Sequence, residues 1–239
     1  MLQVCLNGAR NRAACSHLPV TAAELAAAAR EAVAAGAVDV HLHPKDSDAR
    51  DTLEATAVAA AVNAVRAAVP GTAVGVTTGA WAGPDPYVRV AQVRSWSVLP
   101  DHASVNWHED GAAEVAQALL DRGIGVEAGV YSGTDAAERF LGWPGSRRVL
   151  RVLAEITETT TQDALYAASE LLERLRPAAA PILLHGEDAG AWPVLRLAAA
   201  RRLDTRIGLE DALHLPDGEP AADNASLVRA ARAIIRLAS

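Results

Sequence analysis

Short apolar runs alternate with helical patterns along the whole chain. Eight runs of four to eight residues are rich in β-branched and other apolar side chains, as buried strands are; they are residues 2–6, 37–43, 73–78, 103–106, 124–130, 149–156, 181–185 and 205–210. The intervals between them have helical periodicity. The first begins with a Thr21/Glu24 capping box and ends at Gly36, and the shortest spans residues 134–141. A last helical stripe is formed by Leu227, Val228, Ala231, Ile234 and Ile235.

This alternation predicts a (β/α)8 TIM barrel, a single domain over residues 1–239. An open, doubly wound sheet is the alternative. The polar residues favour the barrel, because nearly every apolar run ends in polar side chains, and in a barrel these ends meet at the face where active sites are built. The residues at these ends are Asn7, His41, His43, Thr77, Thr78, Asn106, Glu127, Glu155, His185, Glu187, Glu210 and Asp211.

Composition limits the partners and the cellular compartment that we expect for this barrel. The chain is 51% hydrophobic and only 4% aromatic, which favours closely packed, alanine-rich helices. Its formal charge is −7 and no basic run is interleaved with aromatic residues, so we expect no nucleic-acid partner. Cys5 and Cys15 are the only cysteines, which indicates a reducing compartment. No segment has the length of a membrane span or of a signal peptide's apolar region, and we therefore expect a cytoplasmic protein with no membrane partner.

Two histidines stand at the end of the apolar run VDVHLHP, residues 38–44. Successive side chains of a strand point to opposite faces, so His41 and His43 share one face. They are either a pair of metal ligands or two histidines that are bonded separately to backbone or carboxylate groups.

The last predicted strand carries the sequence TRIGLED. Alternation places Arg206 and Glu210 on one face, with Asp211 at the turn beyond. This strand and the histidine strand both neighbour the first strand of a closed barrel, so Glu210 can approach the two histidines. Two imidazoles and a carboxylate leave coordination positions open, which is typical of a catalytic divalent site; zinc is expected, and iron or manganese accepts the same ligands. The alternative is a metal-free Arg206–Asp211 ion pair that fills the barrel.

Five segments of the chain resemble the beta-keto acid cleavage enzymes, a family that includes 3-keto-5-aminohexanoate cleavage enzyme. These segments are LNGAR, HLHPKD, VGVTTGAW, ASVNWHE and TRIGLED, in order along nearly the whole chain. The resemblance implies a zinc-bearing (β/α)8 barrel, often a dimer or tetramer, that reacts a β-keto acid with acetyl-CoA to give acetoacetate and a new acyl-CoA. It implies His41, His43 and Glu210 as zinc ligands, Asp211 as the general base and Arg206 as the partner of that base.

The resemblance also implies a substrate pocket lined by Thr77, Thr78, Gly79, Ser104 and Asn106. Their hydroxyl and amide groups are suited to bind a substrate carboxylate or developing negative charge. The alternative for each of them is a hydrogen bond to loop backbone.

The chain departs from the family at two charged positions. Arg10 stands where the family carries a glutamate that receives an amino group. A second family carboxylate falls on Gly129, which leaves Glu127 two residues away on the same predicted face and a candidate for substrate binding. Arg10 and Arg12 would repel an ammonium group, so we expect a β-keto acid with an anionic or neutral polar tail. The alternative is that Arg10 pairs with a nearby acid.

Other functions remain as alternatives. Amidohydrolase-type metalloenzymes also use His-x-His on a barrel strand, but they require a lysine and further histidines where this chain has Asn106, Glu127 and Glu155. A metal-dependent hydrolase or lyase of another type, or a non-catalytic barrel that binds a small acid, fits the same fold. His185 is either a further ligand or acid, or a histidine of the core.

Overall fold

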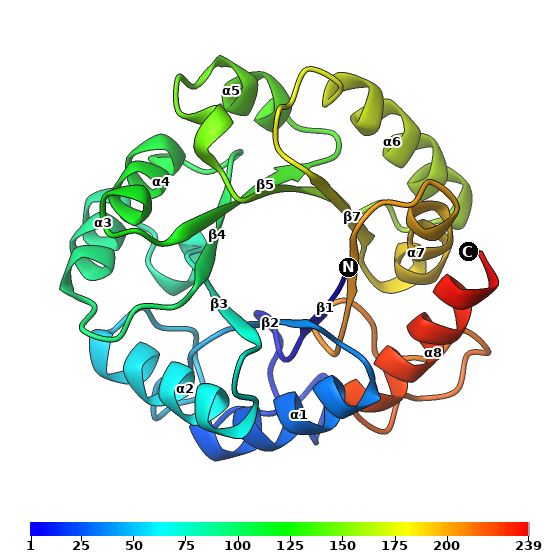
Figure 1. The fold of residues 1–239 in the computed structure, drawn as a ribbon, viewed down its shortest axis with the longest axis horizontal. Helices are drawn as coiled ribbons and strands as arrows, with labels where there is room; N and C mark the ends of the chain where they lie inside the picture. Colours follow the sequence, from blue (N-terminus) through cyan, green and yellow to red (C-terminus); the bar gives the residue numbers. More distant parts are fainter. Residues whose placement is uncertain (239) are drawn as a thin grey trace.

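Eight parallel strands form the inner ring of the protein (Figure 1). The structure is a computed structural model, and it describes residues 1–238. The strands are β1 (Leu2–Cys5), β2 (Asp39–Leu42), β3 (Ala73–Thr77), β4 (His102–Asn106), β5 (Gly125–Tyr131), β6 (Arg151–Ile156), β7 (Ile182–Gly186) and β8 (Thr205–Ile207). Each neighbours the next in sequence, and β1 pairs with both β2 and β8. A parallel bridge between Leu183 and Asp204 joins the β7 and β8 edges, so the ring is a nearly closed barrel and the open sheet is excluded.

Eight helices surround this ring (Figure 1). They are α1 (Ala22–Ala35), α2 (Ala55–Ala68), α3 (Pro86–Ser95), α4 (Ala112–Asp121), α5 (Ala136–Gly142), α6 (Thr161–Arg174), α7 (Ala191–Ala200) and α8 (Asn224–Leu237), with short 3-10 turns at Ala80–Ala82, Ser146–Arg148 and Asp188–Gly190. The predicted start and end of α1 are confirmed: the Thr21/Glu24 capping box is present, and Gly36 ends the helix with φ 115°. Among the described residues, no helix is both long and apolar enough to cross a bilayer.

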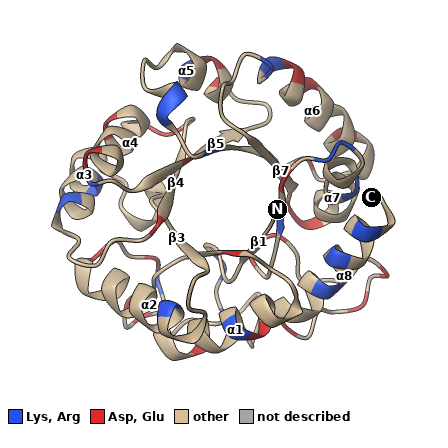
Figure 2. Cartoon of the chain, viewed as in Figure 1, with Lys and Arg blue, Asp and Glu red and all other residues tan. Residues whose placement is uncertain are grey.

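The strands separate an apolar layer from a polar interior. One set of alternate strand residues packs into the main hydrophobic core between the barrel and the helices; it includes Val4, Val40, Val74, Val126 and Val152. The neighbouring positions are buried but polar, and they include Gln3, Asp39, His102, Glu127 and Arg151. Outside this interior, acidic and basic positions are spread around the ring of helices (Figure 2). The barrel therefore concentrates its buried polar groups within the strand ring.

The predicted strands all occur, but the last one is shorter than its pattern indicated. The sequence predicted a strand over residues 205–210, whereas β8 ends at Ile207. At Gly208 the chain turns, and the backbone N–H groups of Asp211 and Ala212 both donate to the Gly208 carbonyl. Glu210 and Asp211 therefore lie on a turn, and the strand alternation that was expected to orient Glu210 does not apply to it.

Candidate active site

Three side chains converge at the carboxyl end of the barrel. The side chains of His41, the last but one residue of β2, of His43 just beyond that strand and of Glu210 each offer a ligand atom within 4.8 Å of the others. Glu210 Oε2 lies 3.9 Å from His41 Nε2 and 3.6 Å from His43 Nε2. This oxygen is buried and accepts no hydrogen bond from the described residues. Two imidazole nitrogens and a free carboxylate oxygen around one point fit a divalent metal with open coordination positions.

The loops around these residues hold them in place from behind. Asn7 clamps the backbone of His43, because its amide donates to the His43 carbonyl at 2.9 Å and its oxygen accepts from the His43 N–H at 2.9 Å. The ring of His43 is fixed by Asp51, whose Oδ2 lies 3.0 Å from Nδ1, and Asp51 is in turn paired with Lys45. A carboxylate on the distal nitrogen of a metal-binding histidine orients the ring and strengthens it as a ligand.

Glycine 8 allows the first loop to pass close to Glu210. Its φ is +57°, and a Cβ at this position would lie 2.4 Å from Glu210 Cγ. The carbonyl of Gly8 accepts a hydrogen bond of 2.7 Å from Lys45. A side chain here would strain the backbone and displace the proposed ligand.

The surroundings shift the pKa values of the two histidines in opposite directions. Burial lowers the pKa of His41 to about 4, so this ring is neutral near pH 7 and its nitrogen lone pair is free to bind a cation. Burial acts in the same sense on His43, but Glu210 and Asp51 outweigh it and raise the pKa of that ring. Burial opposes ionisation of Glu210, yet Arg206 and the two histidines hold its pKa well below the usual range. The site therefore contains an anion that already attracts positive charge.

Arg206 connects this cluster to Asp211. Its Nη2 donates to Glu210 Oε1 at 3.0 Å and to Asp211 Oδ1 at 2.9 Å, and its Nε lies 3.2 Å from the same Asp211 oxygen. Asp211 is fully buried, and its second oxygen, Oδ2, has no partner among the described residues. Arg206 Nε also donates to His185 Nδ1 at 3.1 Å, and His185 Nε2 lies 3.4 Å from Glu155. His185 is therefore a partner of the Arg206–Asp211 pair within the barrel.

A cavity of about 390 Å³ opens above these groups. It is lined by Ala9, Arg10, His43, Trp81, Tyr131, Glu187, Asp188 and Glu210. Trp81 stacks on His43, with ring centroids 5.9 Å apart and planes 4° apart, and so forms a wall beside the proposed metal ligands. The cavity is large enough for a small organic acid and reaches two of the three converging side chains.

The polar residues at the carboxyl ends of β3 and β4 are largely bonded to the protein. The hydroxyl of Thr78 donates to the Ser104 carbonyl at 2.7 Å, and the hydroxyl of Thr77 accepts from the Gly79 N–H at 3.0 Å. The Asn106 amide donates to Glu109 Oε1 at 2.8 Å. All five residues assigned to a substrate pocket from the sequence cluster here, but they do not line the 390 Å³ cavity.

Arg10 lies in the cavity wall but is already paired. Its Nη2 is 2.5 Å from Asp188 Oδ1, and its Nε donates to the Glu210 carbonyl at 2.9 Å. This is the alternative arrangement that the sequence left open for Arg10. Arg10 is therefore not the unpaired cation on which the expectation of an anionic substrate tail was based.

Glu127 lies deeper in the barrel than a substrate-binding residue would. It is fully buried, its carboxylate is bonded to Gln3 and His102, and it is absent from the cavity wall.

Two residues that matter at the site were not recognised from the sequence. Asp51 lies in a loop without a strand-end signal, and Tyr131 is the last residue of β5, one position beyond the predicted strand.

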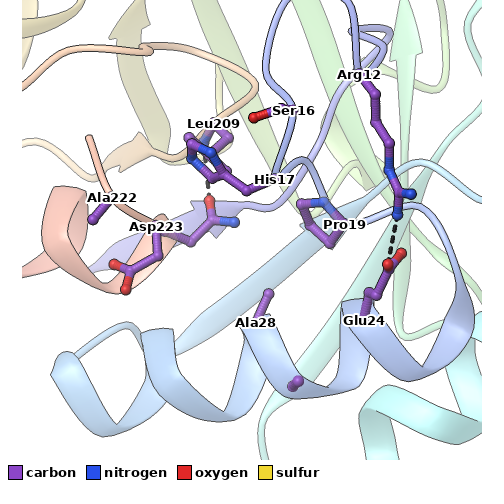
Figure 3. Close-up of a pocket in the computed structure, with 11 residues that line it drawn as sticks. Arg12, Ser16, His17, Pro19, Glu24, Ala28, Leu209, Ala222 and Asp223 are labelled. Atoms are coloured by element: carbon purple, nitrogen blue, oxygen red, sulfur yellow. Dashed lines mark hydrogen bonds and ion pairs between the residues drawn. The ribbon is translucent and has the colours of Figure 1, made fainter. Parts of the chain in front are cut away.

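A second cavity, of about 360 Å³, lies on the outer side of the loop that carries Glu210. Figure 3 shows Leu209 and Asp223 on one side of it and the Arg12–Glu24 pair on the other. None of the three converging side chains lines this cavity, whereas the N-terminus of α8 does. Asn224, which also lines this cavity, accepts a hydrogen bond from the Leu209 N–H of the loop that carries Glu210.

Comparisons with known proteins show the family and the fold of the chain. The family model described as beta-keto acid cleavage enzyme matches residues 1–239. The apo structure of ObcA is similar at a TM-score of 0.73 and 17% identity, over 91% of this chain and 61% of that chain. A binary complex of ObcA with oxaloacetate gives a TM-score of 0.71, 17% identity, and 91% and 63% coverage. The chain thus spans less than two thirds of the length of ObcA.

More distant solved structures share the barrel. 3-Dehydroquinate dehydratase from Geobacillus kaustophilus HTA426 is similar at a TM-score of 0.61 and 10% identity, over 99% of this chain and 90% of that chain. No curated protein matches the sequence. The structural likenesses establish the shared fold, and the family match covers the whole chain.

Proposed function

The chain belongs to the beta-keto acid cleavage enzyme family, and we propose that it is a zinc-dependent enzyme that condenses a β-keto acid with acetyl-CoA. The products are acetoacetate and a new acyl-CoA. The observation that carries this proposal is the convergence of His41, His43 and Glu210 beside the buried Arg206–Asp211 pair. We propose the first three as metal ligands, Asp211 as the general base and Arg206 as the group that orients it.

The donor set suits a catalytic metal. A divalent cation held by the three ligands would polarise the keto oxygen of the substrate and stabilise an enolate. Zinc fits two imidazoles and one carboxylate, and iron or manganese accepts the same set.

The remaining chemistry belongs to side chains of the chain itself. Asp211 Oδ2 has no protein partner, so it is free to take a proton from the carbon between the two carbonyls of the substrate. Arg206 holds Oδ1 and keeps the free oxygen in one orientation. Trp81 and Tyr131 form walls of the cavity in which the substrate would lie.

The net reaction conserves all groups. Two bonds break, the C2–C3 bond of the keto acid and the thioester bond between the acetyl group and the sulfur of coenzyme A. Two bonds form, one between C2, which keeps its carboxylate, and the acetyl carbon, and one between the remaining acyl carbon C3 and the released sulfur. The proton that Asp211 removes from C2 returns to that carbon in the product. No oxidant, reductant or net water is required.

The comparisons support the substrate class. Oxaloacetate, the ligand in one ObcA structure, is itself a β-keto acid. The cavity beside His43 and Glu210 has room for an acid of this size and for the acetyl end of the second substrate. We propose a homo-oligomer, a dimer or tetramer, on the basis of the family resemblance.

Isotope-labelled acetyl-CoA tests the reaction. The protein is incubated with a panel of β-keto acids and acetyl-CoA labelled with ¹³C in the acetyl group, and products are identified by mass spectrometry. The expected result is labelled acetoacetate together with an unlabelled new acyl-CoA. Unlabelled acetoacetate, or cleavage that proceeds without acetyl-CoA, would instead indicate a lyase or hydrolase. Loss of activity with a chelator and recovery with zinc tests the metal.

A further inference from the structure

Four buried charged residues form a closed ring within the barrel. His102 lies 3.0 Å from Asp39 Oδ1 through Nε2 and 2.9 Å from Glu127 Oε2 through Nδ1. Arg151 lies 2.7 Å from Asp39 Oδ2 and 3.1 Å from Glu127 Oε1. Each carboxylate therefore touches both cations. Gln3 completes the cluster by donating to Asp39 at 3.0 Å and to Glu127 at 2.9 Å. These five residues are called the charged ring below.

The charged ring holds its members ionised in spite of burial. Burial alone would lower the pKa of His102, but Glu127 and Asp39 outweigh it and raise the pKa to about 10. The same contacts lower the pKa of Asp39 and of Glu127 although burial opposes this. With two anions and two cations the cluster is neutral, and it joins five neighbouring strands, from β1 to β6 except β3. Strand β3 contributes no side chain to the cluster, because Gly75 lies against it and a Cβ at this position would be 2.0 Å from the His102 ring.

One member of the charged ring faces the proposed metal site. Glu127 Oε2 lies 3.8 Å from His41 Nδ1, a nitrogen that is buried and has no hydrogen-bond partner among the described residues. The other nitrogen of this imidazole, Nε2, faces Glu210. A neutral imidazole that binds a cation through Nε2 must carry its hydrogen on Nδ1, and this hydrogen needs an acceptor in a buried site. Glu127 is placed to be that acceptor once the two atoms approach by about 0.6 Å, to hydrogen-bond distance.

We propose that Glu127 is a positioning residue of the metal site: it accepts the Nδ1–H of His41 and so fixes the tautomer and orientation of that ligand, while the charged ring holds Glu127 in place. The inference rests on the proposed metal site. His43 has an equivalent support in Asp51, so each imidazole ligand is backed by one carboxylate. The two supports differ in origin, since Asp51 comes from a loop and Glu127 from the rigid interior of the barrel.

Asp39 provides a matched control within the same cluster. It contacts both cations of the charged ring, as Glu127 does, but no contact joins it to His41. A purely structural charged ring predicts similar effects of Asp39→Asn and Glu127→Gln on every property. A positioning role for Glu127 predicts that the two variants have similar thermal stability and different metal affinity.

The experiment measures zinc affinity by competition with a chromogenic chelator, and thermal unfolding of the metal-free protein, for wild type and both variants. We expect Glu127→Gln to weaken zinc binding by about 10- to 100-fold, as loss of a carboxylate behind a ligand does, and Asp39→Asn to change it by less than about threefold. Equal affinities of the two variants would overturn the inference. A wild-type protein that binds no zinc would overturn the proposed metal site itself, and neither outcome depends on knowing the substrate.

Nitrogen NMR of the wild-type protein gives a second test, in which no variant of the charged ring has to fold. In zinc-loaded protein with ¹⁵N-labelled histidine, His41, assigned by its loss in His41→Gln, should carry its hydrogen on Nδ1. A hydrogen on Nε2, with metal on Nδ1, would contradict the role assigned to Glu127.

Discussion

Glu210 and Asp211 are neighbours in sequence, yet each leaves a different oxygen free. Glu210 directs Oε2 toward the two histidines, whereas Asp211 holds an unpartnered Oδ2 in the buried interior behind the cavity. Arg206 binds the remaining oxygen of each carboxylate. One cation thus orients two adjacent acids, and substitutions at the two positions should have different effects.

Asp211→Asn should keep the metal and lose most turnover. The substitution preserves size and leaves the three proposed ligands untouched, but it removes the proton acceptor, which typically costs a factor of about 10² to 10⁴ in kcat. Glu210→Gln should instead lower zinc affinity, because a neutral amide replaces an anionic ligand. Metal content and kcat of the two purified variants distinguish them. Identical losses of metal and turnover would remove the separate roles assigned here.

Arg10 should contact the substrate tail only when its own ion pair is broken. Its counter-charge, Asp188, is 67% exposed, so Asp188→Asn should be tolerated by the fold and should leave Arg10 without its partner in the cavity. We expect the ratio of kcat/KM for a carboxylate-tailed over a neutral β-keto acid of equal length to rise about three- to tenfold, since a partly exposed ion pair contributes on the order of 1 kcal/mol. The double variant Arg10→Gln/Asp188→Asn should cancel the gain. An unchanged ratio would mean that the tail lies away from Arg10.

Apolar runs and capping residues predicted the strands and the start of α1 correctly, but they did not predict how the Glu210 side chain is oriented. Apolar runs located all eight strands, and Thr21 with Glu24 located the start of α1. The end of β8 was missed, because the turn at Gly208 depends on the neighbouring strand: a Cβ there would lie 1.9 Å from the Cys5 carbonyl oxygen. A contact of this kind, between residues far apart in sequence, leaves no periodic signal.

The Glu210 turn is therefore supported by another element, helix α8. Asn224 at its first turn accepts from the Leu209 N–H at 2.9 Å and donates to the Leu6 carbonyl at 3.0 Å. Asn224→Ala leaves both backbone groups unsatisfied, and we expect it to lower the free energy of unfolding by about 1–3 kcal/mol and to weaken zinc binding.

Asp223 is the matched control for this prediction. It caps α8 through the Ser226 N–H at 2.6 Å but does not hold the Glu210 turn. Asp223→Ala should cost about 1 kcal/mol of stability and leave zinc affinity unchanged. Denaturant unfolding and chelator competition measure both quantities. Equal zinc affinities of the Asn224 and Asp223 variants would show that α8 does not support the site.

The sequence predicted the barrel and the residues that converge at its mouth, but not the charged ring. His-x-His and the TRIGLED segment are local patterns, and the closed topology brings them together. The charged ring joins single polar residues on five strands. In the sequence, four of them are isolated polar positions within a predicted apolar run, and His102 lies just before one. Only the register of the strands shows that these charges compensate one another.

The charged ring should also make stability depend on pH. His102 has an ordinary pKa of about 6.5 when unfolded, and Glu127 and Asp39 raise its folded pKa to about 10 against the effect of burial. Between these values the folded protein holds a proton that the unfolded chain has lost. Stability from this group is therefore complete below about pH 6.5 and falls as pH rises toward 10, by at most about 1.4 kcal/mol per pH unit.

Two other histidines also have a raised pKa: His43, beside Glu210 and Asp51, and His185, whose pKa is about 8. The contribution of His102 is therefore taken from the difference between wild type and a His102 variant over the range from pH 8 to 9.5. We expect the free energy of unfolding of the wild type, measured with urea in the presence of a chelator, to fall across this range. His102→Gln cannot hold the proton, so its stability should be lower at pH 8 and its slope flatter, and the two curves should approach each other at high pH. Parallel curves would mean that His102 holds no extra proton in the folded protein, and the description of the charged ring as two anions balanced by two cations would then be wrong.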